Sequence, residues 1–88
     1  MRERDIEKYL VGQVKAHKGL CRKVVWVGQR GAPDRLVLLP GRPLVFVELK
    51  APGKPLQPHQ EREHKRLIDA GANVTTIDSF EGVDELCR

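Results

Sequence analysis

Apolar residues recur along the chain with two spacings, one typical of helices and one typical of strands. Near the N-terminus, Ile6, Leu10 and Val14 repeat every four residues, which predicts an amphipathic helix. Two runs rich in leucine and valine flank Pro40-Gly41-Arg42-Pro43 and predict a β-hairpin. Read to the C-terminus, the pattern predicts these elements: a helix at 3–18, strands at 21–27, 35–39 and 44–49, a helix at 58–70, a strand at 73–77 and a helix at 80–86.

The order of these elements predicts an α/β fold with a mixed four-stranded sheet. The strands at 35–39 and 44–49 form an antiparallel hairpin, and the helix at 58–70 connects the hairpin to the last strand. A β-α-β connection of this kind is a right-handed crossover, which makes the last strand parallel to the strand at 44–49. A chain of 88 residues has room for one domain, so we expect residues 1–88 to form a single domain that ends in a short helix.

The distribution of charge indicates what kind of molecule the protein binds. The chain carries 16 Lys and Arg against 12 Asp and Glu, a net charge of +4 with a pI near 9.4. Residues 1–66 hold a net charge of +8, whereas residues 67–88 hold −4. This asymmetry predicts a face that binds a polyanion, although an ordinary solvated basic surface would have the same composition.

Signals of several other protein classes are missing from the sequence. No apolar run approaches the roughly 20 residues of a membrane span, and the N-terminus lacks an apolar signal region. We therefore expect a cytoplasmic protein without a membrane partner. Cys21 and Cys87 show no metal-ligand spacing, either with each other or with the three histidines.

The strand at 44–49 carries the residues that most strongly indicate a catalytic or metal-binding site. The alternating side chains of Phe46, Glu48 and Lys50 share one face, which changes from apolar to charged along the strand. The opposite face is apolar throughout, so the strand is central in its sheet. Burying a charge at the end of such a strand costs desolvation free energy unless a partner such as a cation compensates it. A solvated pair of Glu48 and Lys50 at a strand end is the structural alternative.

A second carboxylate, Asp34, falls opposite Glu48 if a three-residue loop at 40–42 closes the hairpin. Two carboxylates on the same face of neighbouring strands repel one another unless a cation lies between them, and their oxygens suit Mg²⁺ or Mn²⁺. The backbone carbonyl of Leu49 offers a third oxygen. Lys50 is then close enough to orient or deprotonate water, or to neutralise developing charge.

Two helices add polar side chains to the same region. On the first helix, Glu3 lies on the apolar stripe and Glu7 at its edge, so both are candidates to face the sheet. The alternative for a glutamate in a first helical turn is a favourable interaction with the helix dipole. On the helix at 58–70, Gln60 shares a stripe with His64 and faces the end of the central strand. We therefore predict a third carboxylate and an amide near the paired acids.

The residues Pro33-Asp34 and Glu48-Leu49-Lys50 resemble the signature of the PD-(D/E)xK nucleases. With them, other segments occur in the order of the VRR-NUC (virus-type replication-repair nuclease) family: Glu3-Arg4-Asp5-Ile6, Gly31-Ala32-Pro33-Asp34-Arg35 and Leu56-Gln57-Pro58-His59-Gln60. The resemblance covers nearly the whole chain, and the short standalone phage form is the most similar. It implies a restriction-endonuclease-like core of α-β-β-β-α-β order that hydrolyses DNA with Mg²⁺ or Mn²⁺. The implied site comprises metal ligands at Asp34 and Glu48, a first-helix glutamate at Glu3, a catalytic lysine at Lys50 and a supporting glutamine at Gln60, with Glu7 competing for the role of Glu3. With the Leu49 carbonyl, the predicted metal ligands are Asp34, Glu48, Leu49 and Glu3.

The resemblance also implies a substrate and a partner. Standalone members resemble archaeal Holliday junction resolvases, which are homodimers that cut branched DNA, so we expect a homodimer that cuts four-way junctions inside a phage-infected or bacterial cell. Arg30, Arg35 and Lys54 flank the predicted site and predict phosphate contacts without base readout. The alternatives are a PD-(D/E)xK nuclease acting on flaps, nicks or ends, and a non-catalytic basic DNA-binding module.

Overall fold

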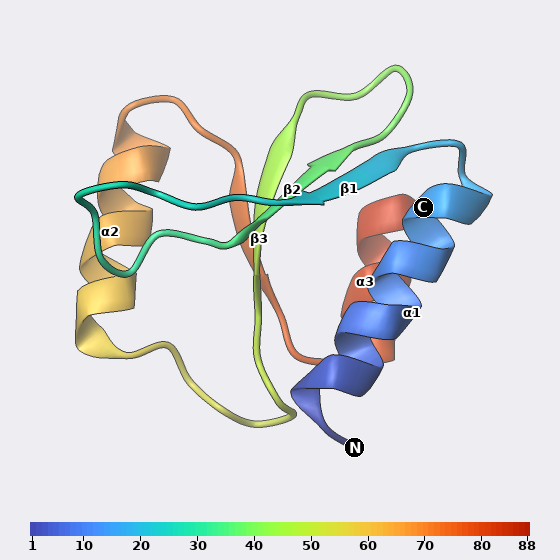
Figure 1. Cartoon of the computed structure of the whole chain (residues 1–88), viewed down its shortest axis with the longest axis horizontal. Coiled ribbons are helices and arrows are strands. Elements are labelled where there is room, and N and C mark those ends of the chain that lie inside the picture. The colour runs from blue at the N-terminus through green and yellow to red at the C-terminus, as the bar shows by residue number, and fades with distance from the viewer.

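The computed structural model describes residues 1–88 and contains all the predicted elements in the predicted order (Figure 1). They are α1 (Glu3–Ala16), β1 (Leu20–Lys23), β2 (Arg35–Leu38), β3 (Val45–Leu49), α2 (Pro58–Asp69), β4 (Val74–Ile77) and α3 (Phe80–Cys87). The first strand is shorter than predicted. Its pairing with β2 ends soon after Lys23, where the N–H of Val24 still donates to the carbonyl of Asp34 at 2.9 Å, although the sequence continues with residues that favour strands.

The sheet is mixed, as predicted, with the order β1-β2-β3-β4. β1 and β3 flank β2 in antiparallel pairs, and β4 runs parallel to β3. The hairpin pairs Arg35 with Val47 and Val37 with Val45, which is the predicted register. The loop of the hairpin is longer than expected, because strand pairing stops at Val37 and Val45.

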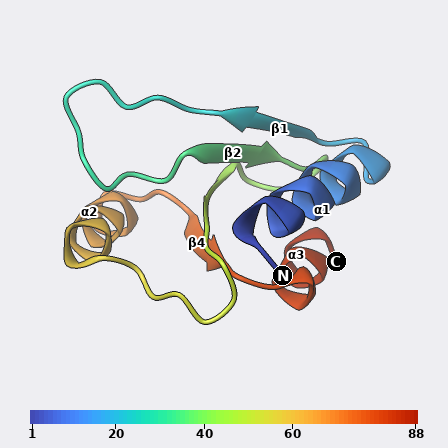
Figure 2. The same ribbon diagram turned by 60° about the horizontal axis from the view of Figure 1, so that its bottom comes forward.

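α1 and α3 pack together on one face of the sheet, whereas α2 stands apart at the other end of the molecule (Figures 1 and 2). The apolar stripe of α1 is fully buried, and the inward residues of three strands and of α3 complete the core with it: Ile6, Leu10, Val14, Val37, Leu39, Val47, Leu49, Ile77, Val83 and Cys87. No helix combines the length and apolar character needed to cross a membrane.

Both ends of α3 are held by polar contacts. At its start, the Ser79 hydroxyl accepts a hydrogen bond from the N–H of Gly82 at 3.0 Å and caps the helix. At its end, Arg42 reaches from the hairpin loop and donates to the carbonyl of Leu86 at 2.8 Å, and also to the carbonyls of Cys87 and Arg88. A cation at a helix C-terminus is favourable, so Arg42 ties the hairpin to the last helix.

Candidate active site

Asp34 and Glu48 lie opposite one another where the paired part of β2 and β3 ends. Arg35 and Val47 are the last pair of the ladder, so the continued register aligns Asp34 with Glu48. Their side chains share the face of the sheet opposite α1, because Arg35 and Val47 point toward the core. The alignment predicted from the length of the hairpin is therefore present.

Glu48 is the electrostatic centre of the site. Burial raises the pKa of Glu48 to about 7, and the negative charges of Asp34 and Glu3 add to this effect, whereas the positive charge of Lys50 opposes it. The charges of three other predicted site residues, Asp34, Glu3 and Lys50, therefore all affect the pKa of Glu48. A buried carboxylate beside other acids is the arrangement that a cation would relieve.

The carbonyl of Leu49 is directed toward β2. Lys50, the next residue, donates its N–H to the carbonyl of Ile77 in β4 at 3.0 Å. Because the hydrogen-bonding groups of successive residues point to opposite sides of a strand, those of Leu49 face β2. The residue in register there is Pro33, which has no N–H to donate. The Leu49 carbonyl therefore has no partner in the sheet and is available as a ligand.

The oxygen atoms at this end of the sheet fit a hard divalent cation. No three side chains of His, Cys, Asp or Glu converge closely enough to hold a metal by themselves. Two carboxylates and a free carbonyl nevertheless match Mg²⁺, which usually takes one or two carboxylates and completes its shell with water and substrate phosphate. The residues present could therefore provide part of the oxygen shell of a hard divalent cation such as Mg²⁺ or Mn²⁺.

The two glutamates of α1 have different surroundings. Glu7 forms an ion pair with Arg35, so its carboxylate is occupied. Glu3 is exposed at the first residue of α1, rather than packed against the sheet as expected, and its charge acts on both Glu48 and Arg35. Of the two, Glu3 is the better candidate for the helical carboxylate of the site.

Arg35 does not reach the surface. It is 5% exposed, and its guanidinium donates to Oε2 of Glu7. Burial lowers the pKa of Arg35, and the charge of Glu3 opposes this. A buried guanidinium that already pairs with a carboxylate cannot also contact a DNA phosphate, so the prediction that Arg35 binds DNA is wrong. The cause is strand alternation, which turns Arg35 toward α1 while Asp34 faces the other way.

Arg30 and Lys54 both lie on exposed loops that adjoin the site in sequence. Arg30 belongs to the loop before Asp34, and Lys54 closes a turn after β3 by donating its N–H to the carbonyl of Ala51 at 3.0 Å. Neither cation takes part in an ion pair within the protein. Both are therefore free to bind an external anion.

The loop that carries Asp34 extends to α2 and packs against its start (Figures 1 and 2). Gly31 has a φ of +81°, and a Cβ atom there would lie 2.6 Å from the carbonyl oxygen of His59. The indole N–H of Trp26 donates to the carbonyl of Pro33 at 2.7 Å. The backbone immediately before Asp34 is thus held from two sides.

α2 contributes one predicted residue and one that the sequence reasoning did not assign. The side-chain oxygen of Gln60 accepts a hydrogen bond from the N–H of Gln57 at 2.8 Å, so Gln60 caps its own helix. His64, one turn further along, is buried with Nε2 at 3.6 Å from Oε1 of Glu48. The only feature of the sequence that places His64 near the site is its helical spacing from Gln60, which puts both residues on one face of α2.

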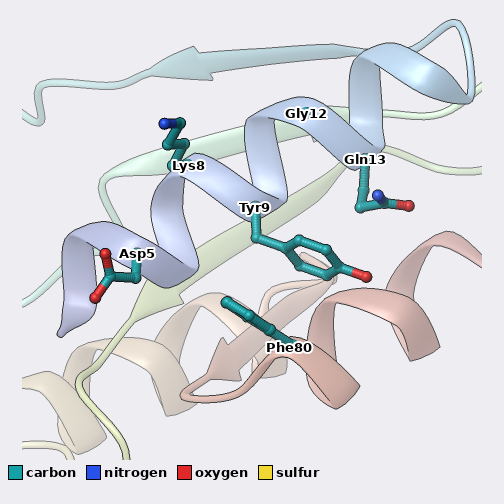
Figure 3. Close-up of a pocket in the computed structure, with 6 residues that line it drawn as sticks. All are labelled: Asp5, Lys8, Tyr9, Gly12, Gln13 and Phe80. Carbon is teal, nitrogen blue, oxygen red and sulfur yellow. The ribbon is translucent and has the colours of Figure 1, made fainter. Parts of the chain in front are cut away.

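The largest surface pocket lies away from these residues, between α1 and α3 (Figure 3). Its lining residues are Asp5, Lys8, Tyr9, Gly12, Gln13 and Phe80. The rings of Tyr9 and Phe80 stack with centroids 4.4 Å apart, and the Tyr9 hydroxyl donates to Asp84 at 2.6 Å. These contacts join the two helices, and none of the predicted site residues lines the pocket.

We expect the metal-free protein to lose stability as the pH rises from about 5 to about 8. Glu48 titrates near pH 7 in the folded protein and near 4.5 when unfolded, so folding favours its protonated form. The stabilisation is complete below the unfolded pKa and is lost as the pH rises through the folded pKa, by about 2–3 kcal/mol. Urea unfolding in EDTA at both pH values measures this loss. Glu48→Gln should lack it, and an equal loss in both proteins would contradict the assignment.

Comparison with known proteins places the chain in a family. No profile of a known protein family matches the sequence. The protein named "Putative nuclease p44" of Acyrthosiphon pisum secondary endosymbiont phage 1 is 49% identical over 79 residues, which cover 90% of this chain and 85% of the relative. A solved structure described as "VRR_NUC domain" matches with a TM-score of 0.84 at 44% identity, covering 96% of this chain and 91% of the other. At this identity and coverage, the chain belongs to the VRR-NUC family of nucleases.

Proposed function

We propose that the protein is a metal-dependent endonuclease that hydrolyses phosphodiester bonds in branched DNA. The observation that carries the proposal is the buried Glu48 carboxylate, aligned with Asp34 across the hairpin and influenced by the charge of Lys50. Family membership supports nucleic-acid hydrolysis as the reaction. The choice of metal rests on the chemistry of the residues, and the choice of branched DNA rests on the resemblance to junction resolvases.

Asp34, Glu48 and the carbonyl of Leu49 would hold Mg²⁺ or Mn²⁺, with Glu3 contributing from α1. When bound, the cation supplies positive charge that offsets charge developing on the phosphate and lowers the pKa of water. Lys50 provides a second positive charge beside Glu48, where it can orient the attacking water or stabilise the developing charge. Gln60 keeps the start of α2 in place against the loop that carries Asp34.

Charge favours DNA as the substrate, without base-specific contacts. Residues 1–66 carry a net charge of +8, and the exposed Arg30 and Lys54 lie on the loops before and after the two carboxylate strands. Contacts from such side chains to phosphates give affinity that does not depend on sequence. Selection by the shape of the DNA is therefore the better explanation of specificity.

A homodimer would suit a four-way junction, because a two-fold axis presents two sites to a nearly symmetric substrate. Apolar side chains at β1 and in the segment that follows support a second copy as the partner. Leu20 and its partner in β2, Leu38, are both exposed, and Val25 and Val27 are 86% and 94% exposed. An interface with a second copy would remove some of these exposed apolar side chains from water.

Cleavage of a labelled four-way junction tests the proposal directly. We expect cutting in Mg²⁺ or Mn²⁺, none in EDTA, and rates on the junction at least about tenfold above those on linear duplex with the same arms, a difference of about 1.4 kcal/mol in transition-state stabilisation. Two sites on one junction should produce paired cuts, and light scattering should show a dimer.

The other outcomes separate the parts of the proposal. Equal rates on junction and duplex would remove branch selectivity and leave a nuclease. Faster cutting of flaps or nicked duplex would favour the alternative substrate. Binding of DNA without cutting, whatever the metal, would contradict the nuclease and favour a DNA-binding module.

A further inference from the structure

A histidine of α2 lies against the buried side of Glu48. Nε2 of His64 is 3.6 Å from Oε1 of Glu48, and the two side chains are 6% and 11% exposed. Nε2 is one of two buried side-chain nitrogen or oxygen atoms in the protein without a hydrogen-bond partner. Buried polar atoms in proteins rarely lack a hydrogen-bond partner. We therefore expect Nε2 to gain a partner in a state of the protein other than the metal-free one.

The His64 ring also lies near the loop that carries Asp34. Burial lowers the pKa of His64, and the nearby backbone of Gly31 opposes this effect. The backbone of Gly31 is also packed against His59 at the start of the same helix. Because its pKa is lowered, the His64 ring is neutral and carries one N–H, which Nε2 can present to Glu48.

We infer that His64 is a positioning residue, whose Nε2 forms a hydrogen bond with Oε1 of Glu48 when that carboxylate binds a cation. The contact would select one orientation of the carboxylate and leave its second oxygen for the cation. The present separation is just beyond hydrogen-bond distance, and such contacts often tighten once the site is filled. The inference rests on the proposed function only in taking Glu48 as a metal ligand.

Mn²⁺ binding to the full-length protein without DNA provides the test, followed by calorimetry or by electron paramagnetic resonance. We expect His64→Leu to weaken Mn²⁺ binding by about 10–100-fold, which is the usual effect of removing a group that orients a metal ligand. His64→Gln keeps an N–H donor and should recover most of the affinity. His59→Leu, a histidine replaced on the same helix, is the matched control and should bind Mn²⁺ like the wild type.

Cleavage kinetics and thermal unfolding complete the comparison. At limiting Mn²⁺, His64→Leu should lower kcat and leave KM for DNA unchanged, because His64 acts on Glu48 and not on the nucleic acid. If His64→Leu fails to fold, His64→Phe replaces it as a ring of similar size without a donor. Wild-type Mn²⁺ affinity in the apolar variant would overturn the inference, as would equal weakening in the leucine and glutamine variants.

The outcome for DNA cleavage is separate from the outcome for His64. A wild-type protein that binds Mn²⁺ but cuts no DNA would contradict the proposed function. The inference would still stand if His64→Leu weakened Mn²⁺ binding and His64→Gln restored it. Conversely, active cleavage with equal Mn²⁺ affinity in all variants would overturn the inference and leave the proposed function intact.

Discussion

Lys50→Met should lower the rate of DNA cleavage by about 10²–10⁴-fold, the range found for groups that move a proton or stabilise charge in the transition state. Lys50 adjoins the strand end that carries Glu48, and its charge already acts on that carboxylate in the metal-free protein. Methionine keeps the unbranched shape and removes the positive charge. Single-turnover cleavage of the junction with saturating enzyme measures the chemical step without the contribution of DNA binding.

Lys65→Met is the matched control for this experiment. Lys65 is exposed on α2 and pairs with Asp69 at 2.7 Å, away from the paired carboxylates along the chain. Exposed pairs of this kind contribute little, so the control should cut and bind DNA as the wild type does. DNA affinity of Lys50→Met should also stay near that of the wild type. If Lys50→Met cut DNA at the wild-type rate, the assignment of Lys50 would be wrong.

Gly31→Ala should destabilise the protein by about 3 kcal/mol or more, because a strained backbone and a steric clash act together. The φ of +81° at Gly31 disfavours any residue with a Cβ atom, and the added atom would lie 2.6 Å from the carbonyl oxygen of His59. Either the loop or the start of α2 must move. Both carry residues of the site, so the rate of cleavage should fall as well. Urea unfolding gives the change in free energy.

Gly28→Ala separates the two causes. Gly28 has a similar φ of +78°, but nothing lies within 4 Å of an added Cβ atom. This variant should show only the backbone penalty, about 1 kcal/mol, and should cut DNA normally. Equal destabilisation of the two variants would mean that contact between Gly31 and α2 contributes little to stability or to the placement of Asp34.

The alignment of Asp34 with Glu48 could be predicted from the sequence because it depends on local facts. Turn residues fix where the hairpin reverses, alternation fixes which side chains share a face, and together they place the two acids opposite one another. The starts of the last two helices were also predictable, since Pro58 suits the first helical position and Ser79 suits an N-cap for reasons that involve only neighbouring residues.

Features that depend on distant contacts were not predictable in this way. The burial of Arg35 follows from the position of α1, and its partner Glu7 lies 28 residues away in the sequence. The approach of His64 to Glu48 depends on where the crossover helix settles beside the sheet, which no periodicity specifies. The early end of β1 at Lys23 was not predictable either, because the residues that follow it favour a strand.

The hydrogen bond from Trp26 to the carbonyl of Pro33 has a practical consequence. Trp26 is the only tryptophan of the chain, and its indole is bonded to the residue immediately before Asp34. The intrinsic fluorescence of the protein therefore comes mostly from one fluorophore attached to the segment that carries a proposed ligand. Movement of that segment, whether caused by a cation, by DNA or by a substitution in the loop, is reported optically without any label.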